Sequence, residues 1–248
     1  MFNYKEYCDD YNKTIKINEL FTIARKNSNR YKKYFTDEKL FKLFDSSLYS
    51  FVMMFKDKTG ATGHHHNFFG GLLVHTFEML DILWDTYVQH PENAMKFNLK
   101  KDPDNKEFNF GTCAIAILYH DYGKLFEYKH SDGPNKNGKF SIAYPMIQKG
   151  HIYMSTERFT KDADKAGVGG HAADEVKHCI LAHHSKLEWG SPVKPITPEA
   201  RIVCACDLIS AGNASGKEDY FDDYVRNGSK LGNQEDYYNN NVIPNLEK

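Results

Sequence analysis

The stretch GTCAIAILYHDYGK, residues 111–124, decides the fold class of this chain. An apolar run leads directly into His120 and Asp121, so two ionisable side chains stand at the end of a buried segment. The β-branched residues of the run are also compatible with a strand, but the segments around it read as helices, which favours a helix here. A carboxylate in such surroundings is costly to bury unless it is paired or coordinated.

Helical periodicity continues on both sides of this stretch. Apolar residues from Leu40 to Phe55 recur at helical spacing and predict a helix over residues 36–56, with Thr36 as its N-cap. Thr197 and Pro198 are typical of a cap and a first helical position, and they predict a helix that ends near Gly212. The same reasoning predicts helices over residues 71–89, after residue 151 and over residues 170–184.

The segments between these helices are polar and rich in Pro, Gly and Asn. One of them, residues 128–145, leaves room for a short hairpin. The predicted fold class is therefore all-α, a helical bundle with a short hairpin in a loop. We expect an N-terminal helical extension over residues 1–50, the main domain over 51–216 and a polar C-terminal extension over 217–248.

Composition restricts the class of protein. The chain has 248 residues, 41% of them hydrophobic, and a formal net charge of −1, so a globular protein is expected and a broadly basic nucleic-acid scaffold is not. The 5 cysteines form no CxxC motif, which favours a reducing cytosol over a disulfide framework. The N-terminus lacks the apolar core of a signal peptide, and no apolar run is long enough to span a membrane, so a cytoplasmic location is expected.

Histidines gather in GHHHNFFGGLLVHT, residues 63–76. The stretch is internal and continues into an apolar run, so it belongs to the fold and is no purification tag. His75 lies near the buried face of its predicted helix. Further candidates follow in order along mostly apolar segments: the pair His120–Asp121, His151 in KGHIY, the pair His183–His184 in LAHHSK, and Asp207 in CACDLIS.

Imidazole and carboxylate groups are ligands that suit Fe, Mn, Co or Zn. A single buried carboxylate such as Asp207 is equally compatible with a hydrogen bond to a helix end or to a histidine. The repetition of the same residue types on successive helices favours a metal site over that alternative for the set as a whole.

Two levels of resemblance follow from these motifs. HDYGK, residues 120–124, resembles the HD signature of the HD-domain metal-dependent phosphohydrolases, and the order of the other histidines and the helical aspartate fits that superfamily. HHNFFGGLLVHT (65–76) and ILAHHSKLEWGSPVKPITPEA (180–200) are similar to the HD domain of the YhaM-type bacterial 3′-to-5′ exoribonucleases. The similarity runs from about Phe51 to Gly212.

The resemblance implies a fold, a cofactor and site residues. It implies an HD-domain helical bundle and a divalent metal centre, expected to hold two ions, with Mn or Fe favoured and Mg, Co, Ni or Zn as alternatives. One ion would be held by His75, His120, Asp121 and Asp207. Asp121 would bridge to a second ion, held by His151, His183 and His184. Two ions of this kind activate water and hold the phosphoryl oxygens.

Other residues are expected to contact the substrate. Lys124 would place an ammonium on the phosphate or the leaving oxygen and act with Asp121 in catalysis. We expect His65 and His66 to face the phosphate, where an imidazolium near neutral pH would suit. Ser191 is expected to shape the pocket, and Trp189 either stacks a base or packs against the protein. His184 is the other candidate contact with the phosphate.

These observations predict a phosphohydrolase that cleaves phosphoester bonds of nucleic acids or nucleotides, with a 3′-to-5′ exonuclease acting on single strands as the favoured form. The first alternative is a nucleotide phosphohydrolase that acts on a mononucleotide or a cyclic nucleotide. The expected helical N-terminus, where the exoribonucleases carry an OB-fold, and the near-zero net charge favour this alternative. The second alternative is a catalytically idle HD module that binds a ligand. An oligomer is compatible with each of the three.

Overall fold

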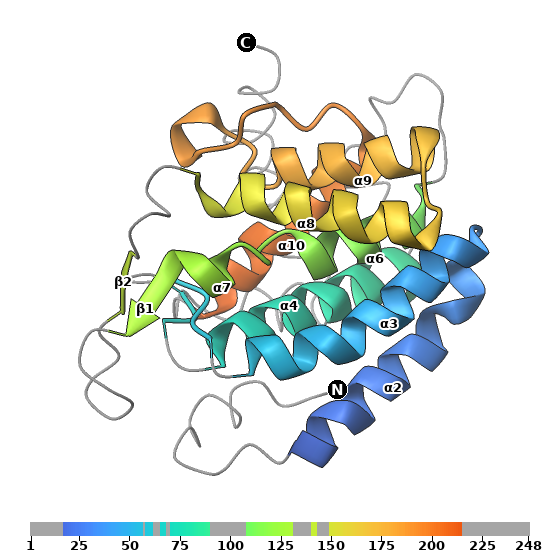
Figure 1. Cartoon of the computed structure of the whole chain (residues 1–248), viewed down its shortest axis with the longest axis horizontal. Coiled ribbons are helices and arrows are strands. Elements are labelled where there is room, and N and C mark those ends of the chain that lie inside the picture. The colour runs from blue at the N-terminus through green and yellow to red at the C-terminus, as the bar shows by residue number, and fades with distance from the viewer. Residues whose placement is uncertain are drawn as a thin grey trace, which may run out of the picture.

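The computed structural model describes residues 17–56, 58–61, 65–67, 70–89, 108–130, 140–142 and 149–214. The described part of the chain is built mainly from helices (Figure 1). They are α2 (Ile17–Tyr31), α3 (Glu38–Phe55), α4 (Gly71–Ile82), α6 (Phe110–Tyr119), α7 (Lys124–Glu127), α8 (His151–Ala166), α9 (Gly170–Ala182) and α10 (Pro198–Ala214).

Helix α6 forms the centre of the bundle, because every residue from Phe110 to Tyr119 is buried. Helices α3, α4, α9 and α10 pack around it, and α8 packs on α9 and α3. Figure 1 shows α2 at the outer edge of the bundle beside α3, with α8 and α9 on the opposite side. An apolar core extends from Ala24 of α2 to Cys206 of α10. The all-α fold class is therefore confirmed.

Helix boundaries agree with the predictions except at two places. Asp37, and not Thr36, caps α3, because its carboxylate accepts hydrogen bonds from the backbone N–H groups of Lys39 and Leu40. The short carboxylate reaches both donors from a position next to the first helical residue. The predicted helix over residues 71–89 is also not uniform, since α4 ends at Ile82 and the chain continues as a wider π-helix over Leu83–Gln89.

The remaining elements follow the predictions closely. Thr197 caps α10 by accepting a hydrogen bond from the N–H of Ala200 at 3.3 Å. The expected hairpin is present as β1 (Tyr128–His130) paired antiparallel with β2 (Phe140–Ile142). No helix in the described part of the chain is both long and apolar enough to cross a membrane. The C-terminal extension expected over residues 217–248 lies outside the described residues.

Candidate metal centre

Three helices bring the first group of candidate ligands together. His75 comes from the first turns of α4, His120 and Asp121 follow the end of α6, and Asp207 lies in the middle of α10. Nε2 of His75 lies 3.1 Å from Oδ1 of Asp207 and 3.7 Å from Oδ2 of Asp121. Nε2 of His120 lies 3.2 Å from Nε2 of His75 and 3.2 Å from Oδ2 of Asp121. The four side chains thus meet at one buried point.

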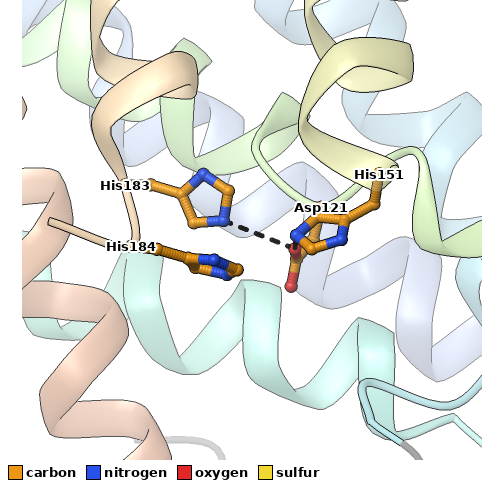
Figure 2. Close-up of side chains that lie close together, drawn as sticks. All are labelled: Asp121, His151, His183 and His184. Carbon is orange, nitrogen blue, oxygen red and sulfur yellow. Dashed lines mark ion pairs between the residues drawn. The ribbon is translucent and has the colours of Figure 1, made fainter. Parts of the chain in front are cut away.

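A second group lies on the other side of the same aspartate (Figure 2). His151 is the first residue of α8, and His183 and His184 follow the end of α9. Oδ1 of Asp121 lies 3.6 Å from Nε2 of His151 and 3.7 Å from Nε2 of His183. The rings of His183 and His184 are 4.2 Å apart. Asp121 therefore turns one oxygen toward each group.

The other ring nitrogens of these histidines are occupied. Nδ1 of each faces an oxygen: Ser210 Oγ for His75 at 2.9 Å, the Ile117 carbonyl for His120 at 2.7 Å, Glu127 Oε2 for His151 at 2.8 Å and the Ile180 carbonyl for His183 at 2.7 Å. Backbone carbonyl oxygens only accept hydrogen bonds, so His120 and His183 carry a proton on Nδ1. Their Nε2 atoms are then free to donate a lone pair, which is the arrangement found in metal-ligating histidines.

Three buried atoms of the second group have no hydrogen-bond partner: Oδ1 of Asp121 and Nε2 of both His151 and His183. Buried polar atoms are nearly always satisfied, and leaving one unsatisfied costs about 1–3 kcal/mol. All three atoms are electron-pair donors, and they lie within 4.8 Å of one another. The residues present therefore fit a divalent cation at this position.

The electrostatics of the centre favour the same conclusion. Burial would raise the pKa of Asp121, but His120 and Lys124 outweigh it and hold that pKa well below its ordinary value. Burial lowers the pKa of His75 to about 3, although Asp207 opposes the shift. Burial also holds the pKa of His183 well below its ordinary value. Burial would lower the pKa of His120, but the neighbouring Asp121 outweighs it and raises that pKa. Burial would raise the pKa of Asp207, but His75 and the other imidazoles outweigh it and hold that pKa below its ordinary value. Two ionised carboxylates thus face the neutral imidazoles of His75 and His183, a set that attracts a cation.

Lys124 is a buried residue of the centre and no solvated side chain. Its Nζ lies 2.7 Å from Oδ2 of Asp121, and only 8% of its side chain is exposed. Burial would lower the pKa of Lys124, but Asp121 outweighs it and raises that pKa. The ammonium group therefore stays charged beside the bridging carboxylate.

A close backbone contact brings α8 to the aspartate. Gly123 donates its N–H to Oγ of Ser155, one turn into α8, at 2.9 Å. A Cβ on Gly123 would lie 2.2 Å from the carbonyl oxygen of His151. Only a glycine permits this approach, which places His151 against the turn that carries Asp121.

The histidine-rich turn lies beside the first group. His66 has a φ of 55°, an uncommon conformation for a residue with a side chain, and it is buried. His65, His66 and His75 form a third group whose donor atoms lie within 4.8 Å of one another. Burial lowers the pKa of His65 to about 4, which disfavours the imidazolium expected at this residue. His64 lies outside the described residues.

The loop after α9 is tied to the second group. Nδ1 of His184 lies 2.6 Å from the carbonyl oxygen of Trp189, and Ser185 between them has a φ of 62°. The Trp189 side chain is 47% exposed, and Nζ of Lys186 lies 4.6 Å from the centre of its ring. Ser191 is buried, and its hydroxyl has no hydrogen-bond partner. The backbone of Trp189 is thus held against His184, while the residue is partly exposed, with Lys186 over its ring.

Sequence reasoning missed three residues around the ligand set: Ser210 and Glu127 contact the expected ligands His75 and His151, and Glu78 contacts Ser210 and His66. Glu78 stands three residues after His75 on α4, and Ser210 stands three residues after Asp207 on α10. Residues three apart share a helix face, so the positions of His75 and Asp207 could have predicted that Glu78 and Ser210 lie near the centre. Glu127 gives no such signal, because its contact with His151 depends on how α7 and α8 pack.

Comparison with known proteins agrees with this geometry. A family model described as HD domain matches residues 75–212. The curated relatives are named 3′-5′ exoribonuclease YhaM. The protein of Listeria monocytogenes serotype 4b is 30% identical over 159 residues, which cover 63% of this chain and 44% of the relative. The protein of Oceanobacillus iheyensis is 32% identical over 153 residues, which cover 61% of this chain and 41% of the relative.

The chain spans less than half of the length of these relatives. No solved structure gives a significant match. The HD-domain match, however, covers more than half of the chain and includes the histidines and aspartates of both groups. The chain therefore belongs to the HD-domain family, as its ordered motifs predicted.

Proposed function

We propose that this chain is a metal-dependent phosphohydrolase that removes nucleotides from the 3′ end of single-stranded nucleic acid. The observation that carries the proposal is the position of Asp121 between the two histidine groups, with Oδ2 near His75 and His120 and Oδ1 near His151 and His183. A carboxylate that offers one oxygen to each side is suited to bridging two divalent ions.

The residues proposed to hold the ions form two groups, one on each side of Asp121. His75, His120, Asp121 and Asp207 would hold one ion, and Asp121, His151 and His183 would hold the other, with His184 as a further ligand or as a contact with the phosphate. When bound, such ions supply Lewis-acid activation of water and of the phosphoryl group. Mn or Fe is our preferred identity for both.

Protein groups around the ions would orient the substrate. Lys124 keeps Asp121 in place and has further N–H donors that a phosphoryl oxygen can use. Trp189 presents an exposed ring on which a base can stack, and such stacking contributes about 1–3 kcal/mol per base. His184 holds the backbone of Trp189 near the centre, because its Nδ1 lies 2.6 Å from the Trp189 carbonyl oxygen. The names of the relatives favour RNA as the polymer.

A second function is a nucleotide phosphohydrolase. One observation favours it: Lys124 lies at the centre but is already paired with Asp121, which leaves less positive charge for a polymer backbone. The formal net charge of −1 agrees with that alternative. A mononucleotide needs fewer phosphate contacts than a strand does.

The test is incubation of the purified protein and Mn²⁺ with 5′-labelled single-stranded RNA and DNA, with the same strands blocked at the 3′ end, and with free nucleotides. We expect shortening from the 3′ end, release of mononucleotides and no reaction on the blocked strands. Activity should fall steeply between about 50 and 200 mM salt, because a strand makes several phosphate contacts.

Asp121→Asn should abolish the reaction. Asp174→Asn is the matched control, since Asp174 is exposed and pairs only with Lys177 among the contacts described. Intact strands together with consumed nucleotides would replace the exonuclease by the nucleotide phosphohydrolase. A metal-loaded protein that leaves both substrates intact would identify an idle binding module.

A further inference from the structure

A carboxylate outside the ligand set lies between two chains of hydrogen bonds. Oε2 of Glu78 is 2.7 Å from Oγ of Ser210, which in turn is 2.9 Å from Nδ1 of His75. The same Oε2 is 3.0 Å from Nε2 of His66, whose Nδ1 is 2.8 Å from Nδ1 of His65. Glu78 therefore reaches one expected metal ligand through Ser210 and the histidine-rich turn through His66.

The direction of the protons in the first chain follows from the number of donors. A carboxylate only accepts, and a serine hydroxyl has one hydrogen. Ser210 must donate that hydrogen to Glu78, because otherwise two oxygens would face each other at 2.7 Å without a proton. The Ser210 oxygen then accepts from His75, which places the His75 proton on Nδ1 and leaves Nε2 as a lone-pair donor.

The second chain is fixed in the same way. His66 donates from Nε2 to Glu78, so the Nδ1 of a neutral His66 is an acceptor. His65 then donates from its own Nδ1 and keeps a lone pair on Nε2. His66 is buried, and these two hydrogen bonds orient His65 through it.

Another interaction competes for the tautomer of His75. Its Nε2 lies 3.1 Å from Oδ1 of Asp207, which would favour a proton on Nε2 in the absence of a metal ion. A proton on Nε2 would occupy the atom that faces the centre. The chain from Glu78 opposes this tautomer, because it requires the proton on Nδ1.

We propose that Glu78 is a positioning residue that fixes the tautomers of His75, through Ser210, and of His65, through His66. The tautomers can be measured whether or not the proposed function holds. The effect of Glu78 on metal binding, however, rests on the proposed metal centre. Partners of this kind around metal-ligating histidines are worth about 10–100-fold in metal affinity.

The first measurement is nitrogen–proton correlation NMR of metal-free protein labelled with ¹⁵N-histidine, which reports the tautomer of each ring. The wild-type protein should carry the His75 proton on Nδ1. Glu78→Ala and Ser210→Ala should both move it to Nε2, whereas Glu78→Gln, which keeps an acceptor oxygen, should retain the wild-type tautomer. Glu157→Ala is the matched control on an exposed ion pair of α8.

The second measurement is Zn²⁺ affinity by competition with a chelating dye. Glu78→Ala and Ser210→Ala should each lower the affinity by about 10–100-fold. The double variant should bind no more weakly than the weaker single variant, because both act on His75 along one chain. If Glu78→Ala does not fold, Ser210→Ala carries the same test.

An unchanged His75 tautomer in folded Glu78→Ala or Ser210→Ala would overturn the inference, as would additive losses of Zn²⁺ affinity. A wild-type protein that shows the expected tautomer but binds no metal would refute the proposed function and leave the positioning role of Glu78 standing.

Discussion

Replacing Asp121 by asparagine should destabilise the metal-free protein as well as remove a ligand. The substitution keeps the shape of the side chain but leaves the ammonium of Lys124 without its counter-charge. Lys124 cannot turn to solvent without leaving the core, since 8% of its side chain is exposed and its partner is 2% exposed. The pair therefore does not belong to the surface ion pairs, which contribute about 0–1 kcal/mol.

The distance between Lys124 and Asp121 sets the magnitude of the expected loss of stability. At 2.7 Å the attraction of two unit charges is about 6 kcal/mol for an effective dielectric constant of about 20. Desolvation of both groups offsets most of this energy, but that cost remains when one partner is removed. Breaking such a pair costs about 3–5 kcal/mol. A typical domain has about 5–15 kcal/mol of stability, so Asp121→Asn should remain folded with a clearly lower denaturation midpoint.

The assay is urea unfolding of EDTA-treated protein, followed by far-ultraviolet circular dichroism, for Asp121→Asn, Lys124→Met and the double variant. The double variant should be more stable than the sum of the two single losses predicts, by about 2 kcal/mol. Asp174→Asn should leave the free energy of unfolding within about 0.5 kcal/mol of wild type. Additive losses from the two single variants would refute the view that Lys124 and Asp121 stabilise each other.

Three further predictions concern the ligands and the substrate surface. Asp207→Ala should lose metal and activity while keeping its helical circular dichroism, and full metal occupancy by elemental analysis would remove Asp207 from the ligand set. His183→Ala should lower the number of bound ions, whereas His184→Ala should mainly raise KM or lower kcat; near-wild-type kinetics in both would argue against the second ion. Trp189→Ala should weaken binding of a single strand by about 1–3 kcal/mol in a fluorescence titration, and Trp189→Phe should restore most of it. Equal affinity of the wild-type and Trp189→Ala proteins would mean that no base stacks on this ring.

Much of the fold was accessible from the sequence because the helices are strongly patterned. The apolar run before His120 has no polar face, and the structure accordingly makes it the central helix α6. Helix ends were less accessible where two residues compete for one role. Thr36 and Asp37 are both good caps, and their choice depends on where the preceding turn ends.

The candidate site was predictable as a set of residues but not as a network. Order along the chain suggested that His75, Asp121 and Asp207 converge, and the structure brings them together. The pairing of Lys124 with Asp121 has the spacing of neighbours on one helix face, but the contacts of Glu78 with Ser210 and His66 depend on how separate segments pack. The sequence placed Lys124 at the phosphate, whereas its ion pair with Asp121 became visible only in the packed helices.

The backbone contact between Gly123 and α8 separates the spacing of the helices from the chemical identity of the side chain at position 151. The atoms that a side chain on Gly123 would meet are backbone atoms of His151, and not its imidazole. The distance between α8 and the turn that carries His120 and Asp121 is thus set by backbone atoms and does not depend on the side chain at position 151. If His151 is a ligand as proposed, its exchange for a carboxylate or an amide would shift the preference of the proposed centre from softer to harder ions while the spacing of the backbone stays constant. Metal preference in a lineage with this turn can therefore drift by single substitutions.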